Sequence, residues 1–432
     1  MGSQGRPAAV RGKLMSLEVV DYNGPFTLLS GYQASKRARP IMRSKRAIVA
    51  RLLLVCGGLS VGLLATEVTL RILGTAYPLP YLPDVNVGSR LRPGFSAWFS
   101  KEGLAHVQIN RAGFRDREHE LEKPANTFRI AVLGDSFAEA VQVSLQDTFW
   151  SVLERRLAAA PQFAGKDVEV LNFGISGHGT AQQLQMLRHY ALSYEPDIVL
   201  LAFFAGNDVR NNSPQLEPDD VRPFFLIDDA QLKLDDSFLR HPDFIKANSG
   251  LTQIKVAAIN ASRVLQVVNE WKNRPAPPAK GASYFEAGVD DRVFVEPVEP
   301  EWQSAWDVTD ALIAEINQVA RQHDARLVVA TVTQAIQLHP DADVRSQFAN
   351  DLGVPDLFYP ERRIEALGKD HDFDVVALSR PMLDAATRDR KFFHGFEGNG
   401  LGTGHWNPAG HRLAAELIAE ALLERRGRSI LD

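Results

Sequence analysis

Between residues 127 and 425, short apolar runs alternate with helical patterns. Because the runs are continuously apolar, they are typical of strands buried on both faces of a parallel sheet. They predict five strands, at Thr127–Leu133, Val168–Asn172, Asp197–Phe204, Arg326–Thr331 and Phe373–Leu378. The patterns around them predict helices at about 147–159, 181–194, 303–323, 361–369 and 408–425. This order predicts an α/β fold in three layers, with a five-stranded, mainly parallel sheet flanked by helices.

An uncharged stretch near the amino end, Leu52–Thr66, is the candidate for a membrane segment. As a helix it spans about 22 Å, which is short of the ~30 Å hydrocarbon core. A start at Ala47 gives twenty residues with one charge, Arg51. Residues 1–51 hold ten Lys and Arg against two acidic residues, and such a basic flank predicts a cytoplasmic amino end. We therefore predict a single-pass transmembrane anchor at 47–73 in the inner (cytoplasmic) membrane, with an extracytoplasmic, periplasmic domain.

Other interpretations of this stretch stay open. A cleaved signal peptide needs a small-residue site, which Ala65-Thr66-Glu67 fits poorly. A lipoprotein at Cys56 has too little apolar sequence before it, and a buried core helix is compatible with so short a run. Residues 1–46 are predicted to be a disordered basic tail, or in part an over-extended start before Met42. Residues 74–126, rich in Pro, Gly and charge, are predicted to be a linker and lead-in segment.

Composition argues against several classes of function. A net charge of −5 disfavours nucleic-acid binding. The single cysteine, Cys56, excludes an intramolecular disulfide and a Cys-based zinc site. The sequence has no HExxH or P-loop pattern, so a metalloprotease of that type or a P-loop nucleotide enzyme is not expected. We expect neither a metal nor a cofactor.

Four short motifs carry the candidate chemistry. Gly134-Asp135-Ser136 follows the first predicted strand, at the edge where parallel sheets bind ligands. The glycine-rich block 172–180 follows the second strand, and its glycines let a backbone N–H approach a substrate closely. Gly206-Asn207-Asp208 follows the third strand, where an amide can donate to an oxyanion. The block 404–411 opens the last helix, with Pro408 suited to the first helical position. Each motif alone could be a turn or a helix cap.

Together and in this order, the motifs resemble those of the SGNH (GDSL-type) hydrolase superfamily over about residues 127–425. The segment 110–116 (NRAGFRD), with the membrane anchor, resembles the bacterial membrane-anchored branch of that superfamily. The resemblance implies an SGNH, flavodoxin-like fold.

The connection between Phe204 and Arg326 is about 120 residues long, whereas a crossover between parallel strands needs a few dozen. We therefore predict an insertion at about 210–300 that packs near the active-site rim, as a lid would.

Carried over residue by residue, the resemblance implies Ser136 as the nucleophile and His405 as its general base. The backbone N–H groups of Ser136 and Gly177 and the side-chain amide of Asn207 would form the oxyanion hole. The chemistry needs this set, because a serine hydroxyl is a poor nucleophile until a base takes its proton. The tetrahedral oxyanion then needs preplaced donors. His411 is the alternative base, although its position in the motif places it on the last helix.

The last motif departs from the family where the acid is usually found. The family commonly has Asp three residues before its His, and this chain has Gly402 there. The third triad member is therefore unassigned: Glu397, Asp384 or a backbone carbonyl could orient the imidazole, or a Ser-His dyad could act alone. A smaller departure is Ala205, two residues before Asn207, where the family usually has glycine.

The leading interpretation is an extracytoplasmic serine esterase that cleaves an acyl group, most simply acetyl, from a cell-envelope glycan or lipid. Transfer from acyl-Ser136 to a sugar hydroxyl would make it an O-acyltransferase. The missing Asp motivates an alternative, a non-catalytic membrane-tethered carbohydrate-binding or scaffold module. An α/β-hydrolase is a third reading, since residues 134–138 nearly match GxSxG. The partners expected are an ester-bearing small molecule, glycan or lipid and the bilayer, with the oligomeric state open.

Overall fold

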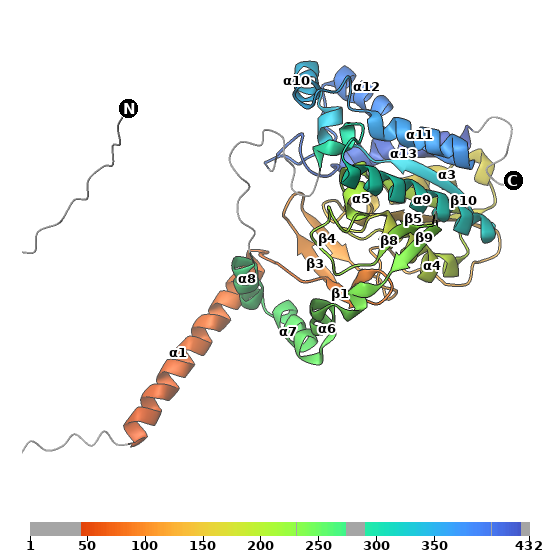
Figure 1. The fold of residues 1–432 in the computed structure, drawn as a ribbon. Coiled ribbons are helices and arrows are strands. Elements are labelled where there is room, and N and C mark those ends of the chain that lie inside the picture. The colour runs from red at the N-terminus through yellow and green to blue at the C-terminus, as the bar shows by residue number, and fades with distance from the viewer. Residues whose placement is uncertain (1–44, 230, 274–289, 399, 425–432) are drawn as a thin grey trace, which may run out of the picture. The chain divides into compact units, whose positions relative to one another are not determined.

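The centre of the fold is a parallel sheet of five strands (Figure 1). The computed structural model describes residues 45–229, 231–273, 290–398 and 400–424. The strands lie in the order β11-β10-β7-β5-β6, and every pairing between them is parallel. Their bounds are β5 Thr127–Gly134, β6 Asp167–Asn172, β7 Ile198–Phe203, β10 Arg326–Thr331 and β11 Asp374–Ala377. The predicted five-stranded sheet is confirmed.

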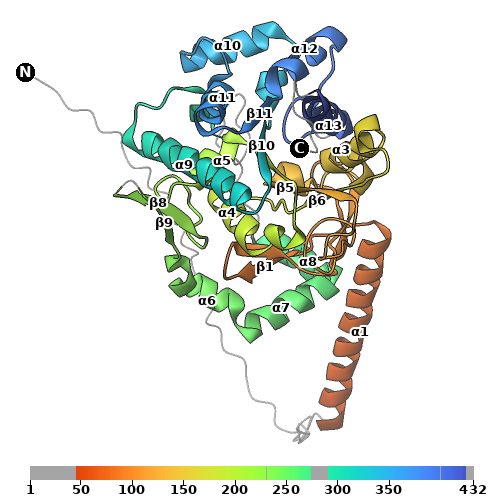
Figure 2. The ribbon, with the colours of Figure 1, turned by 90° about the vertical axis from the view of Figure 1, so that its right-hand side faces the viewer.

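Helices cover both faces of this sheet (Figure 2). Successive residues of β5 point to opposite faces, so Ala131 and Leu133 belong to one half of the core and Ile130 and Val132 to the other. The first half is closed by α4 Thr180–His189, α9 Pro300–Gln322 and α11 Tyr359–His371. The second half is closed by α3 Phe149–Ala158, α12 Ser379–Asp389 and α13 Pro408–Leu423. The predicted three layers are therefore confirmed.

Two of the longer helices around the sheet were not predicted. The five predicted helices correspond to α3, α4, α9, α11 and α13, whereas α10 Ala342–Leu352 and α12 are additional. α10 buries only Phe348 and Ala349. α12 has charged residues at both ends and a proline in its first turn. The buried positions of α12, Ser379, Met382, Ala385 and Ala386, follow helical spacing but are mostly small, so in both helices the apolar stripe that marks an amphipathic helix in a sequence is weak.

The lead-in segment 74–126 is folded and shares the core of the domain. It forms two antiparallel hairpins, β1 Tyr81–Asp84 with β2 Gly88–Leu91, and β3 Ser96–Phe99 with β4 Ala105–Gln108. Side chains from and around these hairpins join the core half that contains α4: Val87, Leu91, Val107, Ile109 and Phe114. The segment therefore does more than link the anchor to the sheet.

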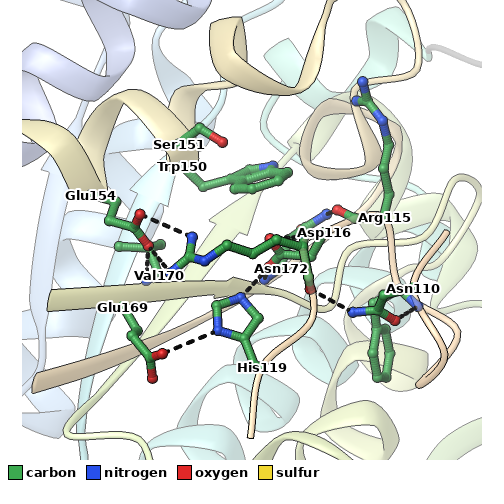
Figure 3. A network of polar contacts seen from close by, with 12 residues as sticks. Asn110, Arg115, Asp116, His119, Trp150, Ser151, Glu154, Glu169, Val170 and Asn172 are labelled. Atoms are coloured by element: carbon green, nitrogen blue, oxygen red, sulfur yellow. Dashed lines mark hydrogen bonds and ion pairs between the residues drawn. The ribbon is translucent and has the colours of Figure 1, made fainter. Parts of the chain in front are cut away.

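A polar network joins the end of the lead-in to β6 (Figure 3). The Asp116 carboxylate accepts a hydrogen bond from the backbone N–H of Asn172 at 2.9 Å. The Asn172 side-chain amide in turn donates to the carbonyl of Arg115 at 3.1 Å. His119 lies 3.2 Å from the same Asp116 carboxylate and 3.5 Å from Glu169 on β6. The network fixes the lead-in at the strand that precedes the glycine-rich block.

The long connection after β7 forms a helical and hairpin insertion. After α5 Ala205–Asn211, the first part of the predicted insertion forms a hairpin, β8 Phe224–Asp228 with β9 Gln231–Asp235. Three helices follow, α6 Pro242–Asn248, α7 Gly250–Ala261 and α8 Arg263–Lys272. The Pro-rich part of the predicted insertion, residues 274–289, lies outside the described residues.

Helix α1, Lys45–Ile72, is long and apolar enough to cross a membrane. It has 28 residues and a mean hydropathy of 2.2 in its most apolar window. Such a helix is consistent with the transmembrane anchor predicted at 47–73. The chain divides into two units, Met1–Leu59 and Ser60–Asp432, so only the last turns of α1 belong to the unit that carries the sheet. The basic tail predicted over 1–46 lies, through residue 44, outside the described residues.

Candidate active site

Ser136 opens the short helix α2, Ser136–Glu139, directly after β5. The Asp135 carboxylate caps this helix by accepting from the backbone N–H of Phe137 at 2.9 Å. Gly134 permits the sharp turn, because a Cβ there would lie 2.9 Å from the Cβ of Ala138. The hydroxyl of Ser136 is thereby held at the carboxyl edge of the sheet, where parallel sheets place ligands.

His405 contacts Ser136 directly. The Nε2 atom of His405 lies 2.8 Å from the Oγ atom of Ser136, although the residues are 269 positions apart. His405 comes from the loop before α13, where Asn407 caps the helix by accepting from the N–H groups of Ala409 and Gly410. Imidazole and hydroxyl are therefore within the distance that proton transfer requires.

A buried polar cluster holds the loop that carries His405. The Nδ1 atom of His394 is 2.7 Å from the carbonyl of Gly404, and its Nε2 atom is 2.9 Å from the hydroxyl of Thr333. The indole N–H of Trp406 donates to the same hydroxyl at 2.9 Å. Burial lowers the pKa of His394 to about 4. The His394 ring is therefore neutral at neutral pH and positions the loop without adding charge.

The carboxylate that orients His405 is Glu102. Both of its oxygens lie 2.9 Å from the Nδ1 atom of His405, and one also accepts from the His405 backbone N–H at 3.2 Å. Burial acts to raise the pKa of Glu102, but the hydrogen bonds and charge of His405 lower it overall. Glu102 therefore takes the place for which Glu397 and Asp384 were the sequence candidates.

The backbone at Gly402 explains why the acid is not found three residues before His405. Gly402 has a φ of +84°, a conformation that an aspartate rarely adopts. A Cβ at this position would also lie 2.8 Å from the ring of Phe392. Gly404 has a φ of +72°, and a Cβ there would lie 3.1 Å from a Glu102 oxygen. The loop is thus shaped to receive a carboxylate from the lead-in.

Contacts near Ser136 hold Asn207 beside the serine and fix the residue before Gly177 to α2. The backbone N–H of Ser136 is at the first position of α2, where N–H groups have no partner within the helix. Gly177 has a φ of +80°, which favours glycine. The side-chain amide of Asn207 donates to the Asp135 carboxylate at 3.0 Å. The same Asp135 oxygen lies 3.5 Å from the Ser136 hydroxyl, so Asn207 is held beside the serine.

Glu139 fixes the glycine-rich block against α2. Its carboxylate accepts from the backbone N–H of Ser176 at 2.6 Å and from the Tyr81 hydroxyl at 3.0 Å. Burial raises the pKa of the Glu139 carboxyl. Because Ser176 immediately precedes Gly177, this contact sets the position of the Gly177 peptide relative to Ser136.

Other polar residues near the motifs have structural contacts. His178 lies 3.0 Å from the carbonyl of Ser89 on β2, and burial lowers its pKa to about 3. The ring of His411 accepts from the backbone N–H of Phe149 at 3.3 Å, and burial lowers its pKa to about 3. His405, and not the alternative base His411, is therefore the imidazole in contact with Ser136.

Two buried carboxylates behind the serine affect each other. Burial raises the pKa of Asp135. Burial and the charge of Asp135 raise the pKa of Asp208 well above its usual value. Asp208 accepts from the backbone N–H of Phe204 and from Gln183, which makes it a support for the turn that carries Asn207.

A cavity of about 530 Å³ borders the Gly177 side of the site. Its walls come from the first hairpin, the glycine-rich block and the insertion helices, and include Tyr81, Ser176, Gly177, Arg222, Phe244 and Val256. Apolar groups with a few polar ones are typical of a small-molecule pocket. Among the residues that the structure describes, no group of three or more His, Cys, Asp or Glu side chains could hold a metal ion.

Arg115 connects the lead-in to the end of α2. Its guanidinium, fully buried, donates to the carbonyls of Glu139, Ala140 and Val143. Burial lowers its pKa to about 10, so the side chain remains charged at neutral pH. The guanidinium thus supplies donors to carbonyls at the end of α2 and in the loop that follows it.

We expect Arg115→Met to lower the free energy of unfolding by about 2–4 kcal/mol, because three buried carbonyls lose a charged donor. The matched control is Arg111→Met in the same loop, where the Arg111 side chain is 92% exposed and its loss should change stability by less than about 0.5 kcal/mol. Chemical denaturation of both variants measures the difference. Equal stabilities would show that the guanidinium contributes nothing net at this position.

The model of the GDSL-like Lipase/Acylhydrolase family matches residues 132–353, just over half of the chain. An acetyl xylan esterase, AlAXEase, is 11% identical with a TM-score of 0.36 and covers 68% of this chain and 100% of its own. TesA is 14% identical with a TM-score of 0.34, covering 68% and 97%. A catalytic mutant of Axe2, an acetylxylan esterase from Geobacillus stearothermophilus, is 11% identical with a TM-score of 0.37, covering 70% and 97%. No curated protein matches the chain.

Proposed function

Because the chain belongs to the GDSL-like lipase/acylhydrolase family, and is thus an ester hydrolase of the SGNH type, we propose that it works as a membrane-anchored serine esterase through an acyl-Ser136 intermediate. The observation that carries this proposal is the continuous chain of contacts from Ser136 through His405 to Glu102. A nucleophile, a base and a group that orients the base, each within hydrogen-bond distance of the next, form the arrangement that activates a serine hydroxyl.

The reaction follows from these positions. Ser136 Oγ attacks the ester carbonyl while His405 Nε2 takes its proton, and Glu102 stabilises the imidazolium that forms. The N–H groups of Ser136 and Gly177 and the Asn207 amide receive the oxyanion. His405 then gives its proton to the leaving alcohol, which leaves the acyl group on Ser136. A water molecule, deprotonated by His405, attacks the acyl carbon. The bond from that carbon to Ser136 Oγ then breaks, His405 returns the proton to Oγ, and the carboxylic acid leaves.

The substrate we propose is an acyl ester, most simply an acetyl ester, on a glycan or lipid of the cell envelope. Helix α1 supports this location, since it is apolar enough to span the inner membrane and the basic flank of the sequence favours a cytoplasmic amino end. The domain that follows the anchor, from residue 74 onward, would then lie in the periplasm. Transfer of the acyl group to a sugar hydroxyl in place of water uses the same residues.

The alternative of a non-catalytic carbohydrate-binding or scaffold module is no longer supported by a missing acid. That alternative was based on the absence of an acid beside His405, and Glu102 supplies this carboxylate from the lead-in.

The full chain in detergent micelles, treated with a fluorophosphonate, tests the proposal. We expect one phosphonyl group on Ser136, found by peptide mass spectrometry, and parallel loss of hydrolysis of a chromogenic acetate ester, because only an activated serine reacts at a useful rate. Ser346→Ala, an exposed serine on α10, should label as the parent chain does. Hydrolysis that persists after full labelling of Ser136, or labelling elsewhere, would contradict the assignment.

A further inference from the structure

Helix α8 turns its apolar side outward. Leu265, Val268 and Trp271, spaced three residues apart, are all exposed, whereas the buried residue of the helix is the polar Gln266. Trp271 is 78% exposed. A surface helix of a soluble domain normally has the opposite arrangement, with its apolar stripe toward the core. The outward apolar side of α8 therefore calls for a contact outside the domain.

Helix α7 continues this apolar side. Leu251 is 82% exposed and Ile254 is 69% exposed. The helix has no acidic residue, and its one charged side chain is Lys255. Helices α6, α7 and α8 follow one another along one edge of the domain (Figures 1 and 2). We call their exposed apolar side the outer surface, which consists of Ile245, Leu251, Ile254, Leu265, Val268 and Trp271.

The last turns of α1 are bound to the junction between α7 and α8. The Glu67 carboxylate accepts from the backbone N–H groups of Arg263 and Val264 and from the hydroxyl of Ser262, each at 3.0 Å. Arg71 donates to the carbonyl of Ala261 at 2.8 Å. An acid thus meets the amino end of α8 and a base the carboxyl end of α7, which is the pairing that helix dipoles favour.

The chain that leaves α1 is held by the same two helices. The backbone N–H of Tyr77 donates to Gln266 at 3.0 Å. The backbone of Leu79 both donates to and accepts from the side chain of Asn260, at 2.8 and 3.0 Å. Contacts on both sides of the end of α1 therefore fix the outer surface to the point where the apolar helix enters the domain.

We propose that the outer surface of α6, α7 and α8 lies in the headgroup region of the lipid bilayer beside α1. The inference rests on the proposed membrane anchoring and goes beyond it, since an anchor alone would leave the domain free to move at the end of its tether. An exposed apolar stripe with a tryptophan and with exposed lysines next to it in sequence, here Lys255 and Lys272, is the composition of a helix that lies in the membrane interface. The aliphatic part of each lysine would lie along the apolar surface, and its ammonium group would reach the lipid phosphates.

Site-directed fluorescence in vesicles tests this contact. Cys56 is the only cysteine, so Cys56→Ser gives a full-length background for Ile254→Cys, Val268→Cys and the control Ser346→Cys on α10. Each is labelled with an environment-sensitive fluorophore and reconstituted in phosphatidylcholine and phosphatidylglycerol vesicles, with or without lipids that carry a nitroxide near the headgroup end of the acyl chain. Circular dichroism and thermal unfolding check each variant, and all three replaced side chains are exposed.

We expect the labels at residues 254 and 268 to shift to the blue and to lose about half or more of their fluorescence to the nitroxide lipids, while the label at 346 stays unquenched. A label on the native Cys56, in the otherwise unchanged chain, reports separately whether α1 is inserted. For this label the lipids carry the nitroxide near the far end of the acyl chain, because Cys56 lies near the middle of the predicted span. If the label at Cys56 is quenched while the label at residue 254 or 268 stays unquenched, as at residue 346, the proposed surface contact is wrong but the membrane anchoring stands. No quenching at Cys56 would overturn both, and hydrolysis of a soluble ester tests the esterase independently of either result.

Discussion

Ser136→Ala is expected to lower kcat for a chromogenic acetate ester by about 10⁴-fold or more, because it removes the nucleophile while the oxyanion donors and the substrate pocket remain. The KM should change little, since no binding contact beyond the hydroxyl is lost. The Ser136 side chain is half-buried and the structure records only weak hydrogen bonding to Asp135 beyond its contact with His405. The variant should therefore fold as the parent does.

Steady-state kinetics of the purified full chain measure this effect. Ser346→Ala, on the outer side of α10, is the matched control and should stay within about twofold of the parent rate, because surface substitutions away from a site are nearly neutral. A Ser136→Ala protein with a normal unfolding transition that keeps a tenth or more of the parent kcat would rule out the acyl-Ser136 route.

Glu102→Gln is expected to lower kcat by about 10³- to 10⁴-fold, comparable to the loss of the acid in other serine triads. The amide keeps the size of the side chain but presents an N–H or a neutral oxygen to His405 Nδ1, so the imidazolium loses its stabilising charge. Glu397→Gln and Asp384→Asn are the controls, because both were sequence candidates for the same role. Each should remain within about threefold of the parent.

The double variant Glu102→Gln with Gly402→Asp tests the backbone argument. It places an aspartate where the family commonly has one, yet we expect no recovery of kcat, because Gly402 has a φ of +84° and lacks room for a Cβ beside Phe392. A recovery of tenfold or more would show that this loop can adopt the usual family arrangement. If the kcat of Glu102→Gln equals that of the parent, His405 does not require a carboxylate to act as the base.

The sheet could be predicted because its strands are continuously apolar and separated by helices. The predicted and observed bounds of β10, Arg326–Thr331, are identical, and β5 differs by one residue. The predicted convergence of Ser136, Gly177 and Asn207 follows from the same topology. Strand β5 pairs in parallel with both β6 and β7. The motifs that follow these three strands therefore lie at the same edge of the sheet.

Glu102 could not be predicted by the same reasoning. It lies in the turn between two four-residue strands, and no motif marks it. The residue is 303 positions from His405, so its role depends on how the lead-in wraps around the sheet edge. The alternating pattern of β4 could have indicated a hairpin, but a hairpin alone does not tell which side chain it delivers to the site.

The insertion helices show a different limit of sequence reasoning. Leu251, Ile254, Leu265 and Val268 recur at helical spacing, which normally indicates a side packed on the core. The structure places them on the outside instead. Periodicity identifies the apolar side of a helix but not what covers it, so the direction of α7 and α8 could be known only from the packed domain.

The delivery of Glu102 by the lead-in limits how this enzyme can be shortened. A fragment that begins at the first strand of the sheet, residue 127, would keep Ser136 and His405 and yet lack their carboxylate. A protease that cuts between Ile72 and the first hairpin would remove the anchor and leave Glu102, Ser136 and His405 in one fragment. A protease that also removes the hairpins would abolish the esterase activity, because Glu102 is lost, although Ser136 remains in the fragment.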